Sequence, residues 1–459
     1  MGEPSTTFAA PKTQLLSILG LDFGLAVVLG GTVGVGILRL PGTVAAQLGS
    51  FWLIVAVWVG GGIYSLLGSF SVAELAAMLP QAGGFYVYGK RAFGEMVGFA
   101  VGWGDWLDNC AALAYAAFAA AEYLILLAPG LPASPRTIAL ALLIGFTAMH
   151  WFGLRISSVV QKFTSSATAI TLLVLAVGCL LFRGSAPPAA AGQGITATTS
   201  GPSHLGLIPM LGVLVLSLRL VIVAYDGWYE AIYFTEEDRN PARNLPRALI
   251  GGVLLVLGLY LILNLAFLRA LGVPALAGSK LPAADAAKII FAAGSGKFVT
   301  ALSLLTLLSL LNCLLLGTPR IIYAIGRDGL FTRRAAIVSA GGTPRAALLM
   351  STATALLLVG LGTFEKIVAI AAVLYVAIYC MAYAAVFALR RKEPALPRPF
   401  RAWGYPWTTA IALGGSALFL VGAAASDPRN AVYAGVLLAI SVPAYFWRRR
   451  SRAQSPATP

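Results

Sequence analysis

The sequence GGTVGVGI, residues 30–37, lies in the middle of an apolar run over residues 22–48. Each glycine in a helix interior costs on the order of 1 kcal/mol, so this stretch predicts local unwinding of a helix. A second stretch, YDGWYE at residues 225–230, puts two carboxylates and a glycine inside the apolar run 207–235. An ionisable group at mid-bilayer costs about 2.5–3.5 kcal/mol, so these acids should face a cavity or a partner. The two stretches predict two broken helices.

The apolar runs around these breaks are long enough to cross a membrane. Of the 459 residues, 59% are hydrophobic and 11% are charged, which excludes an ordinary soluble globular protein. As helices, runs of roughly 17 to 30 residues cover a hydrocarbon core of about 30 Å. The predicted spans are residues 22–48, 51–79, 94–128, 134–153, 157–182, 207–235, 247–272, 297–325, 346–362, 364–390, 406–425 and 430–447. The sequence therefore predicts an all-α membrane protein with about twelve transmembrane helices.

The formal charge of +15 follows from the predicted topology. With a cytoplasmic N-terminus, most of the 32 Lys and Arg fall on the cytoplasmic side, as orientation by basic residues requires. The basic clusters there are residues 90–91, 239–247, 327–345, 390–401 and 448–452. We therefore expect a multi-pass protein of the cell inner (plasma) membrane, with both termini cytoplasmic. The lipid bilayer is its expected partner, and no nucleic acid is expected.

The residue types used for metal binding and enzyme catalysis are scattered along the chain. Four cysteines lie singly in apolar runs without CxxC spacing, and the chain has two histidines, His150 and His204. We interpret the cysteines as core residues and predict no metal site and no cofactor. Because the chain also lacks a clustered His, Cys or acid set and a Walker motif, it is not expected to be an enzyme.

The two broken spans occupy corresponding places in the chain, as the first members of two successive five-helix sets. Interrupted helices at matching positions are typical of inverted-repeat transporters that bind substrate near the midplane. Within a membrane, unwound backbone is tolerated only where it lines a cavity or is satisfied by protein. We therefore predict that the breaks form a binding site.

Five sets of short motifs follow one another along the chain. The motifs are Gly34-Val35-Gly36-Ile37-Leu38 with Leu40-Pro41; Ala73-Glu74-Leu75 with Pro80, Gly83-Gly84, Tyr86, Tyr88 and Phe93-Gly94; Trp228 with Thr235-Glu236-Glu237, Asn240-Pro241, Asn244 and Pro246; Arg320 with Tyr323-Ala324 and Arg327-Asp328-Gly329-Leu330; and Leu389-Arg390-Arg391-Lys392-Glu393-Pro394 with Leu396-Pro397-Arg398-Pro399-Phe400. Together they are similar to the motifs of the amino acid–polyamine–organocation superfamily, especially its L-type amino acid transporter branch and bacterial relatives. Each motif is weak alone, but five in the right order and spacing are specific.

The resemblance implies a LeuT-like fold with five-plus-five inverted repeats and two additional helices, in one transmembrane domain over 1–459. The repeats would cover 20–182 and 207–390, the additional helices 406–447, and a cytoplasmic tail 448–459. It also implies a secondary active transporter for amino acids, a permease or exchanger that works by alternating access. The substrate would be held at the unwound parts of helices 1 and 6.

The resemblance further implies which residues bind an amino acid. The carboxylate would meet free backbone N–H groups near Val35, Gly36 and Ile37. This agrees with the unsatisfied donors and partial positive charge at a helix N-terminus. The ammonium would meet free carbonyl groups near the four residues Thr32, Val223, Ala224 and Asp226. Trp228 is interpreted as an aromatic gate or, alternatively, as a packing residue.

The acids in the predicted spans have both functional and structural explanations. Many L-type relatives have glycine where this chain has Asp226, so this carboxylate could favour cationic substrates or titrate during transport, or pair with Arg219. Glu230, four residues on, could share its helical face. Asp105 and Asp108 either line the pathway or include one partner of Arg39.

Further candidates lie toward the cytoplasmic ends of the predicted spans. Glu74 and Arg320 could pair as an inner-gate latch or as a structural ion pair. The run Glu236-Glu237-Asp238 is interpreted as a solvated face or a local set of ion pairs. Two tyrosines of the tenth span, Tyr375 and Tyr379, are expected in the core or at the cavity.

The sequence leaves the energy source open. Where many relatives have a lysine in helix 5, this chain reads FTSSAT at residues 163–168. Ser165, Ser166 and Thr168 could offer hydroxyl oxygens to sodium, whereas Lys162 is interpreted as an orientation charge. Coupling to protons through Asp226, or plain exchange, is the alternative. An amine or polyamine carrier on the same fold, or an amino acid sensor that does not transport, also fits these residues.

Overall fold

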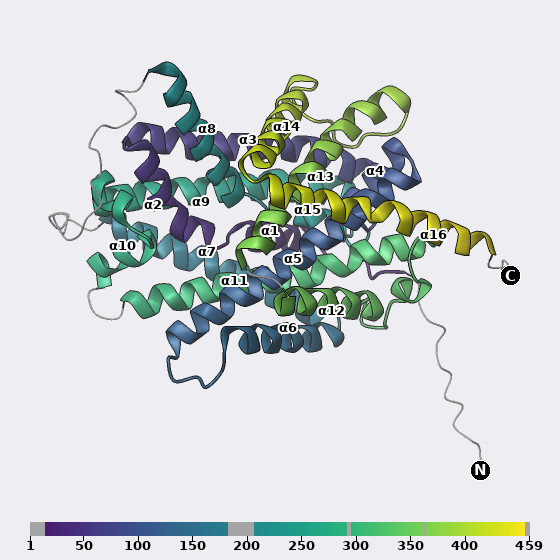
Figure 1. The fold of residues 1–459 in the computed structure, drawn as a ribbon, viewed down its shortest axis with the longest axis horizontal. Helices are drawn as coiled ribbons and strands as arrows, with labels where there is room; N and C mark the ends of the chain where they lie inside the picture. Colours follow the sequence, from purple (N-terminus) through teal and green to yellow (C-terminus); the bar gives the residue numbers. More distant parts are fainter. Residues whose placement is uncertain (1–13, 182–205, 292–294, 362–363, 455–459) are drawn as a thin grey trace, which may run out of the picture.

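The structure, a computed structural model, describes residues 14–181, 206–291, 295–361 and 364–454, which are almost entirely helical. Most of the longer helices run side by side along the longest axis of the molecule (Figure 1). The helices are α1 (Leu21–Thr32), α2 (Gly36–Leu48), α3 (Phe51–Met78), α4 (Phe85–Phe93), α5 (Glu95–Leu127), α6 (Pro135–Trp151), α7 (Leu154–Leu181), α8 (Leu207–Ala224), η2 (Glu230–Phe234), α9 (Pro241–Gly278), α10 (Pro282–Phe291), α11 (Ser295–Arg327), η3 (Arg333–Ala336), α12 (Arg345–Leu361), α13 (Phe364–Lys392), α14 (Trp407–Ser426), α15 (Pro428–Ala439) and α16 (Ser441–Gln454).

The lengths of these helices confirm the all-α membrane class. In the described part of the chain, eight helices are long and apolar enough to cross a membrane, and the bent pair α1 and α2 makes up to nine. The predicted fourth, sixth and ninth spans correspond to the shorter helices α6, α8 and α12, with 17, 18 and 17 residues. The number of twelve crossings therefore stays a prediction.

Small residues bring the central helices together. In α5, Ala114, Ala117 and Ala121 recur at helical spacing and are fully buried. They share a hydrophobic cluster with Leu311 and Leu315 of α11. Without a hydrophobic driving force between helices in lipid, close packing of small residues against larger ones provides the attraction. The α5–α11 pair is thus closely packed at the centre of the bundle.

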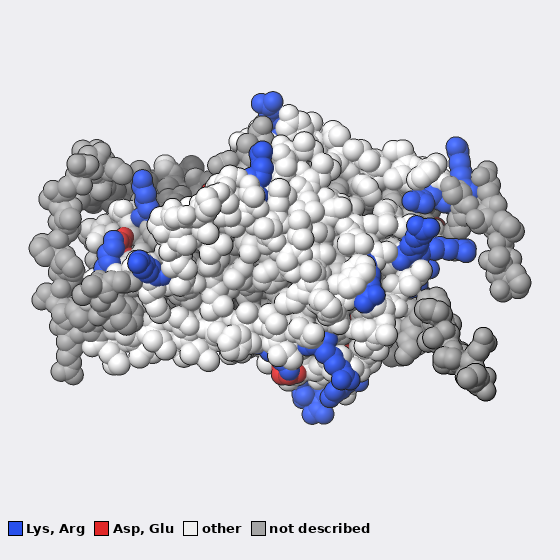
Figure 2. All heavy atoms as spheres, turned by 90° about the horizontal axis from the view of Figure 1, so that it is seen from below, with Lys and Arg blue, Asp and Glu red and all other residues white. Residues whose placement is uncertain are grey.

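The surface matches a protein that sits in lipid. In Figure 2 most of the visible face is uncharged, and Lys and Arg gather toward its ends and margins. Large apolar side chains are exposed, including Trp52, Leu181 and Trp407. Exposed apolar surface on this scale is unusual for a soluble monomer and is expected where lipid covers it.

Several basic clusters that the sequence places on one side are joined at one end of the fold. Lys90 pairs with Asp328 at 2.6 Å, and the hydroxyl of Tyr86 donates to the same carboxylate at 2.5 Å. Burial, together with that carboxylate, raises the pKa of the Tyr86 hydroxyl, so it stays protonated as a donor. A hollow beside this group is lined by Gln14 and Arg448, so the two ends of the described chain lie together.

Two long connectors lie between the predicted spans, over residues 183–205 and 272–297. Residues 183–205 lie outside the described residues. The connector over residues 272–297 contains the short helix α10. It follows a kink at Gly272, where φ is 72°, and packs against α2, α9 and α11.

Candidate functional site between two broken helices

The first break separates α1 from α2. Helix α1 ends at Thr32, Val33 adopts an extended conformation, and α2 begins at Gly36 with a bend of 47° between the helices. The break is shorter than predicted, because Gly30 and Gly31 remain in α1. At Gly30 the missing side chain serves packing instead, since a Cβ there would lie 2.6 Å from the Ser165 hydroxyl. The last carbonyls of α1 and the first N–H groups of α2 lack intrahelical partners.

The second break follows α8. The helix ends at Ala224, and the chain turns through Gly227, which has a φ of 93° that glycine adopts readily. The short 3₁₀ helix η2 then follows. The prediction of one span over 207–235 is therefore wrong in detail, because the α-helix does not resume after the turn. A Cβ on Gly227 would overlap the carbonyl oxygen of Gly31, so the two breaks are in direct contact.

A tyrosine from a third helix ties the breaks together. The hydroxyl of Tyr260 on α9 lies 3.0 Å from the carbonyl oxygen of Thr32 and 3.0 Å from that of Ala224. The hydroxyl proton of Tyr260 is thus shared between the end carbonyl groups of the two broken helices. Tyr260 could not be predicted as a site residue, because nothing in the apolar run 247–272 distinguishes it from a packing residue.

The breaks border a cavity of about 200 Å³. Six of the predicted substrate-binding residues line it: Thr32, Val35, Gly36, Val223, Ala224 and Asp226. Helices α5, α11 and α13 complete the wall with residues that include Asp108, Asn109, Ala111, Ala112, Tyr115, Leu310, Leu314, Ala371 and Tyr375. The cavity therefore combines the ends of two broken helices with side chains from three other helices.

Two predicted binding residues do not line the cavity. The side chain of Ile37 is fully buried in the hydrophobic cluster that joins α2 and α9. Trp228 packs its ring against Tyr379 and lies over Gly68 of α3. Both side chains point away from the break into a helix interface, which for Trp228 is the packing alternative. The predicted role of the backbone N–H group of Ile37 stays a prediction.

Of the predicted acids, Asp108 and Glu230 line the cavity together with Asp226. Asp105, one turn before Asp108 on α5, does not line it. Its carboxylate accepts a hydrogen bond from the Tyr233 hydroxyl at 2.6 Å and one from the Asn109 side chain at 3.2 Å. This acid is thus held in the protein interior beside the cavity.

The basic partners suggested for these acids lie elsewhere. Arg39 donates to the hydroxyl of Tyr123 at 2.9 Å and packs over its ring. Arg219 donates to the hydroxyl of Ser426. Asp226 instead accepts a hydrogen bond from the Tyr379 hydroxyl. The alternatives in which Arg39 or Arg219 neutralises a cavity acid are therefore wrong.

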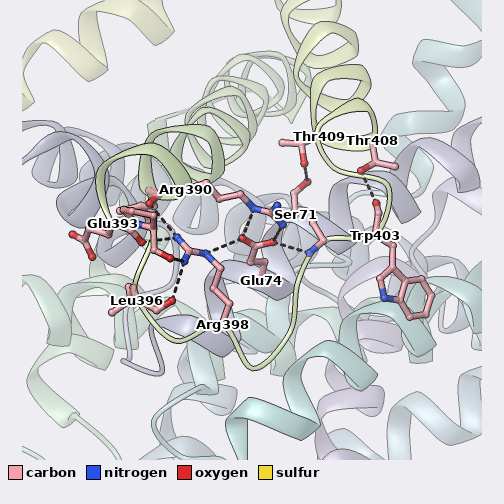
Figure 3. A network of polar contacts seen from close by, with 12 residues as sticks. Ser71, Glu74, Arg390, Glu393, Leu396, Arg398, Trp403, Thr408 and Thr409 are labelled. Atoms are coloured by element: carbon pink, nitrogen blue, oxygen red, sulfur yellow. Dashed lines mark hydrogen bonds and ion pairs between the residues drawn. The ribbon is translucent and has the colours of Figure 1, made fainter.

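Glu74 and Arg320 do not pair with each other either. Glu74, on α3, accepts hydrogen bonds from Arg390 at 2.5 and 2.8 Å and from the backbone N–H of Ala402 at 2.7 Å. Arg398 lies 3.5 Å away on its other side (Figure 3). The side chain of Arg398 also donates to four carbonyl groups of residues 389–396. Glu74 thus fastens the loop after α13 to α3.

Arg320 pairs with Glu237 in the protein interior. The guanidinium donates to both carboxylate oxygens at 2.5 and 2.8 Å, and the side chains are 3% and 0% exposed. Of the two interpretations of the acidic run, the solvated face is wrong for Glu237. The neighbouring Glu236 pairs with Arg327 nearer the surface, at 2.7 Å. Both ion pairs join the segment after η2 to α11, far away in sequence.

Of the hydroxyls considered for sodium, Ser165 belongs to a polar network among α1, α7 and α11, whereas the buried Thr168 hydroxyl has no hydrogen-bond partner among the described residues. Ser165 donates to the carbonyl oxygen of Ala26 at 2.7 Å and lies 3.3 Å from Ser309. Gln161 bonds to Ser165 and to Asn312. Lys162 pairs with Asp22 at the surface, at 2.9 Å.

Comparison with known proteins agrees with this architecture. The sequence profile described as amino acid permease matches residues 23–445. The serine/threonine exchanger SteT of Bacillus subtilis is 26% identical over 447 residues, covering 95% of this chain and 97% of that protein. The mouse Asc-type amino acid transporter 1 is 27% identical over 404 residues, 86% of this chain and 74% of the relative.

A human relative matches over a shorter region. The b(0,+)-type amino acid transporter 1 is 28% identical over 273 residues, which cover 58% of this chain and 54% of that protein. The relatives are transporters rather than enzymes. Because the family profile spans nearly the whole membrane domain, the chain belongs to the amino acid permease family of the amino acid–polyamine–organocation superfamily.

Proposed function

We propose that this protein is a secondary active transporter, a permease or exchanger, for amino acids. The observation that carries the proposal is the cavity at the contact between two broken helices. One helix ends and another begins at its wall, where end carbonyl and N–H groups lack the partners that a continuous helix would give them. A zwitterion offers the complementary pair of charges. Membership of the amino acid permease family supports the same substrate class.

Each charge of the zwitterion has a place in this proposal. The α-carboxylate would accept hydrogen bonds from the first N–H groups of α2 near Gly36, where the helix dipole also favours an anion. The α-ammonium would donate to the carbonyl ends of α1 and α8, near Thr32 and Ala224. Val223 and Asp226 would complete that side. Side chains beyond these backbone groups would set selectivity.

The transport cycle in this proposal is alternating access around the fixed site. Residues 20–182 and 207–390 would form the two inverted repeats, with 406–447 added. Both termini would face the cytoplasm in the inner membrane. Glu74 and Arg320 would act as latches through the partners that they have, Arg390 and Glu237. Protons, rather than sodium, are the proposed coupling ion, with plain exchange as the alternative.

Gly36 offers a test of the carboxylate site. A Cβ at this position would lie 3.4 Å from Ala224, an ordinary contact, so Gly36→Ala should keep binding. The three further carbons of Gly36→Leu would fill the space at the start of α2. We expect Gly36→Leu to weaken amino acid binding by about tenfold to a hundredfold while membrane insertion is unchanged. Thermal-shift titration of the purified proteins with the twenty L-amino acids measures this. Equal affinity in both variants would count against the site.

The three carboxylates at the cavity favour an amine or polyamine carrier as the second candidate function. Uptake of radiolabelled L-amino acids and of putrescine into proteoliposomes separates the two functions. A protein that binds amino acids but shows no flux in this assay would be a sensor, and a protein that binds neither class would contradict both transport proposals.

A further inference from the structure

The cavity carries an excess of acid. Asp108 comes from α5, Asp226 from the second break and Glu230 from η2, so three separate elements bring carboxylates to one space of about 200 Å³. Asp108 and Glu230 are 5% and 2% exposed. Burying an ionised carboxylate without a partner is costly, so such a group requires a counter-charge or a proton.

The protein does not supply that counter-charge within the described residues. None of the ion pairs found there includes Asp108, Asp226 or Glu230. Likewise, no described Lys, Arg or His side chain lines the cavity. The contrast with Glu74 and Glu237 is informative, since the same chain gives those two buried acids arginine partners.

Buried polar atoms at the cavity also lack partners. Within the described residues, the atoms without a hydrogen bond include Glu230 Oε2, Asn109 Oδ1, the Thr32 hydroxyl and the Tyr375 hydroxyl, all on residues that line the cavity. Buried polar groups in folded proteins are normally hydrogen-bonded, so a set of unpartnered groups around one cavity indicates a ligand. Two of these unpartnered groups, on Glu230 and Asn109, are acceptors that a cation with several N–H donors would satisfy.

We propose that the substrate is a cationic L-amino acid, with a side chain that ends in an ammonium or guanidinium group. The inference rests on the proposed function, because it uses the amino acid site at the breaks. The α-carboxylate lies at the start of α2 beside the Thr32 hydroxyl, and the side-chain cation reaches Asp108 and Glu230. The apolar wall of Ala111 and Leu314 accepts the methylene stem.

A cationic amino acid fits this cavity better than a diamine. The first N–H groups of α2 carry a partial positive charge that attracts a carboxylate and repels a second ammonium. Three tyrosines, Tyr115, Tyr229 and Tyr375, also line the cavity, and a tyrosine ring face suits a cation. The ligand that fits this cavity therefore has a carboxylate at one end and a cation at the other.

The test compares ligands that differ only in charge. Norleucine has the stem of lysine without the ammonium, and citrulline is a neutral analogue of arginine. We expect the wild-type protein to bind lysine and arginine at least about tenfold more tightly than norleucine and citrulline at pH 7. Competition against radiolabelled L-arginine uptake in proteoliposomes, and thermal-shift titration of each ligand, give the ratios.

Variants then test which carboxylates bind the side-chain cation of the ligand. Glu230→Gln and Asp108→Asn should each lower the lysine-to-norleucine affinity ratio by about tenfold or more. Glu122→Gln removes a carboxylate from an exposed position on the same helix α5 and should leave the ratio unchanged. Because the ratio in the wild-type protein is measured first, a variant that fails to fold does not remove the test.

Each outcome decides a separate question. Preference for norleucine over lysine would overturn this inference and leave the proposed function standing. Tighter binding of putrescine than of lysine would overturn it in favour of a diamine. Failure of all twenty L-amino acids to bind or to be taken up would instead contradict the proposed function itself.

Discussion

Gly227→Ala is expected to abolish uptake, because the two breaks leave no room for a methyl group between them. A Cβ at Gly227 would overlap the carbonyl oxygen of Gly31, which is backbone and cannot rotate away. The φ of 93° adds a further penalty of about 1–2 kcal/mol for a residue with a side chain. Moving the breaks apart would also separate Thr32 from Ala224, which Tyr260 joins. Initial uptake in proteoliposomes of the L-amino acid that the wild-type protein transports fastest measures the effect.

The matched control is Gly212→Ala on α8. No atom lies within 4 Å of a Cβ there, and alanine favours a helix over glycine by about 1 kcal/mol. This variant should transport at the wild-type rate. If Gly227→Ala transports equally well, the direct contact between the breaks does not matter for the cycle.

Glu237→Gln is expected to produce the largest loss of stability among single substitutions of acids. It leaves the guanidinium of Arg320 uncompensated in the interior, where the arginine is 3% exposed. Removing one partner of a buried ion pair costs about 3–5 kcal/mol, because the remaining charge stays desolvated. The segment after η2 would lose its attachment to α11. The free energy of unfolding in detergent, followed by circular dichroism against denaturant, measures the cost.

The neighbouring pair gives an internal comparison. Glu236 and Arg327 are 24% and 32% exposed, so Glu236→Gln should cost only about 0–1 kcal/mol. A double variant, Glu237→Leu with Arg320→Met, should recover much of the loss, since both charges are then removed from the interior. Equal effects of Glu236→Gln and Glu237→Gln would show that the burial of the pair is irrelevant to stability.

The breaks themselves could be predicted from sequence because glycine and buried acids act locally. The run from Gly30 to Gly36 weakens any helix wherever the chain folds, and the acids of residues 225–230 are costly in any lipid environment. The glycines of this run do not all have the same role in the structure. Gly30 and Gly31 stay helical and allow close packing, whereas the chain departs from the helix only after Thr32.

The partners of charged residues could not be predicted. The sequence suggested Glu74 with Arg320, yet the structure pairs Glu74 with Arg390, 316 positions away, and Arg320 with Glu237. Tyr260 likewise became part of the site only through the packing of α9 on both breaks. Such contacts depend on which helix faces meet, and no local pattern in the sequence encodes that choice.

The amino-acid sequence alone is enough to predict that the chain lies in a membrane as helices and that two of these are interrupted. Both properties depend on hydrophobic length and on backbone preferences, which adjacent residues decide. Only the tertiary structure decided that the interruptions touch, that Ile37 and Trp228 turn away from the cavity, and that Asp108, Asp226 and Glu230 meet there without a basic partner among the described residues. Convergence of side chains from several helices is a property of packing, because it requires elements far apart in sequence to occupy neighbouring positions.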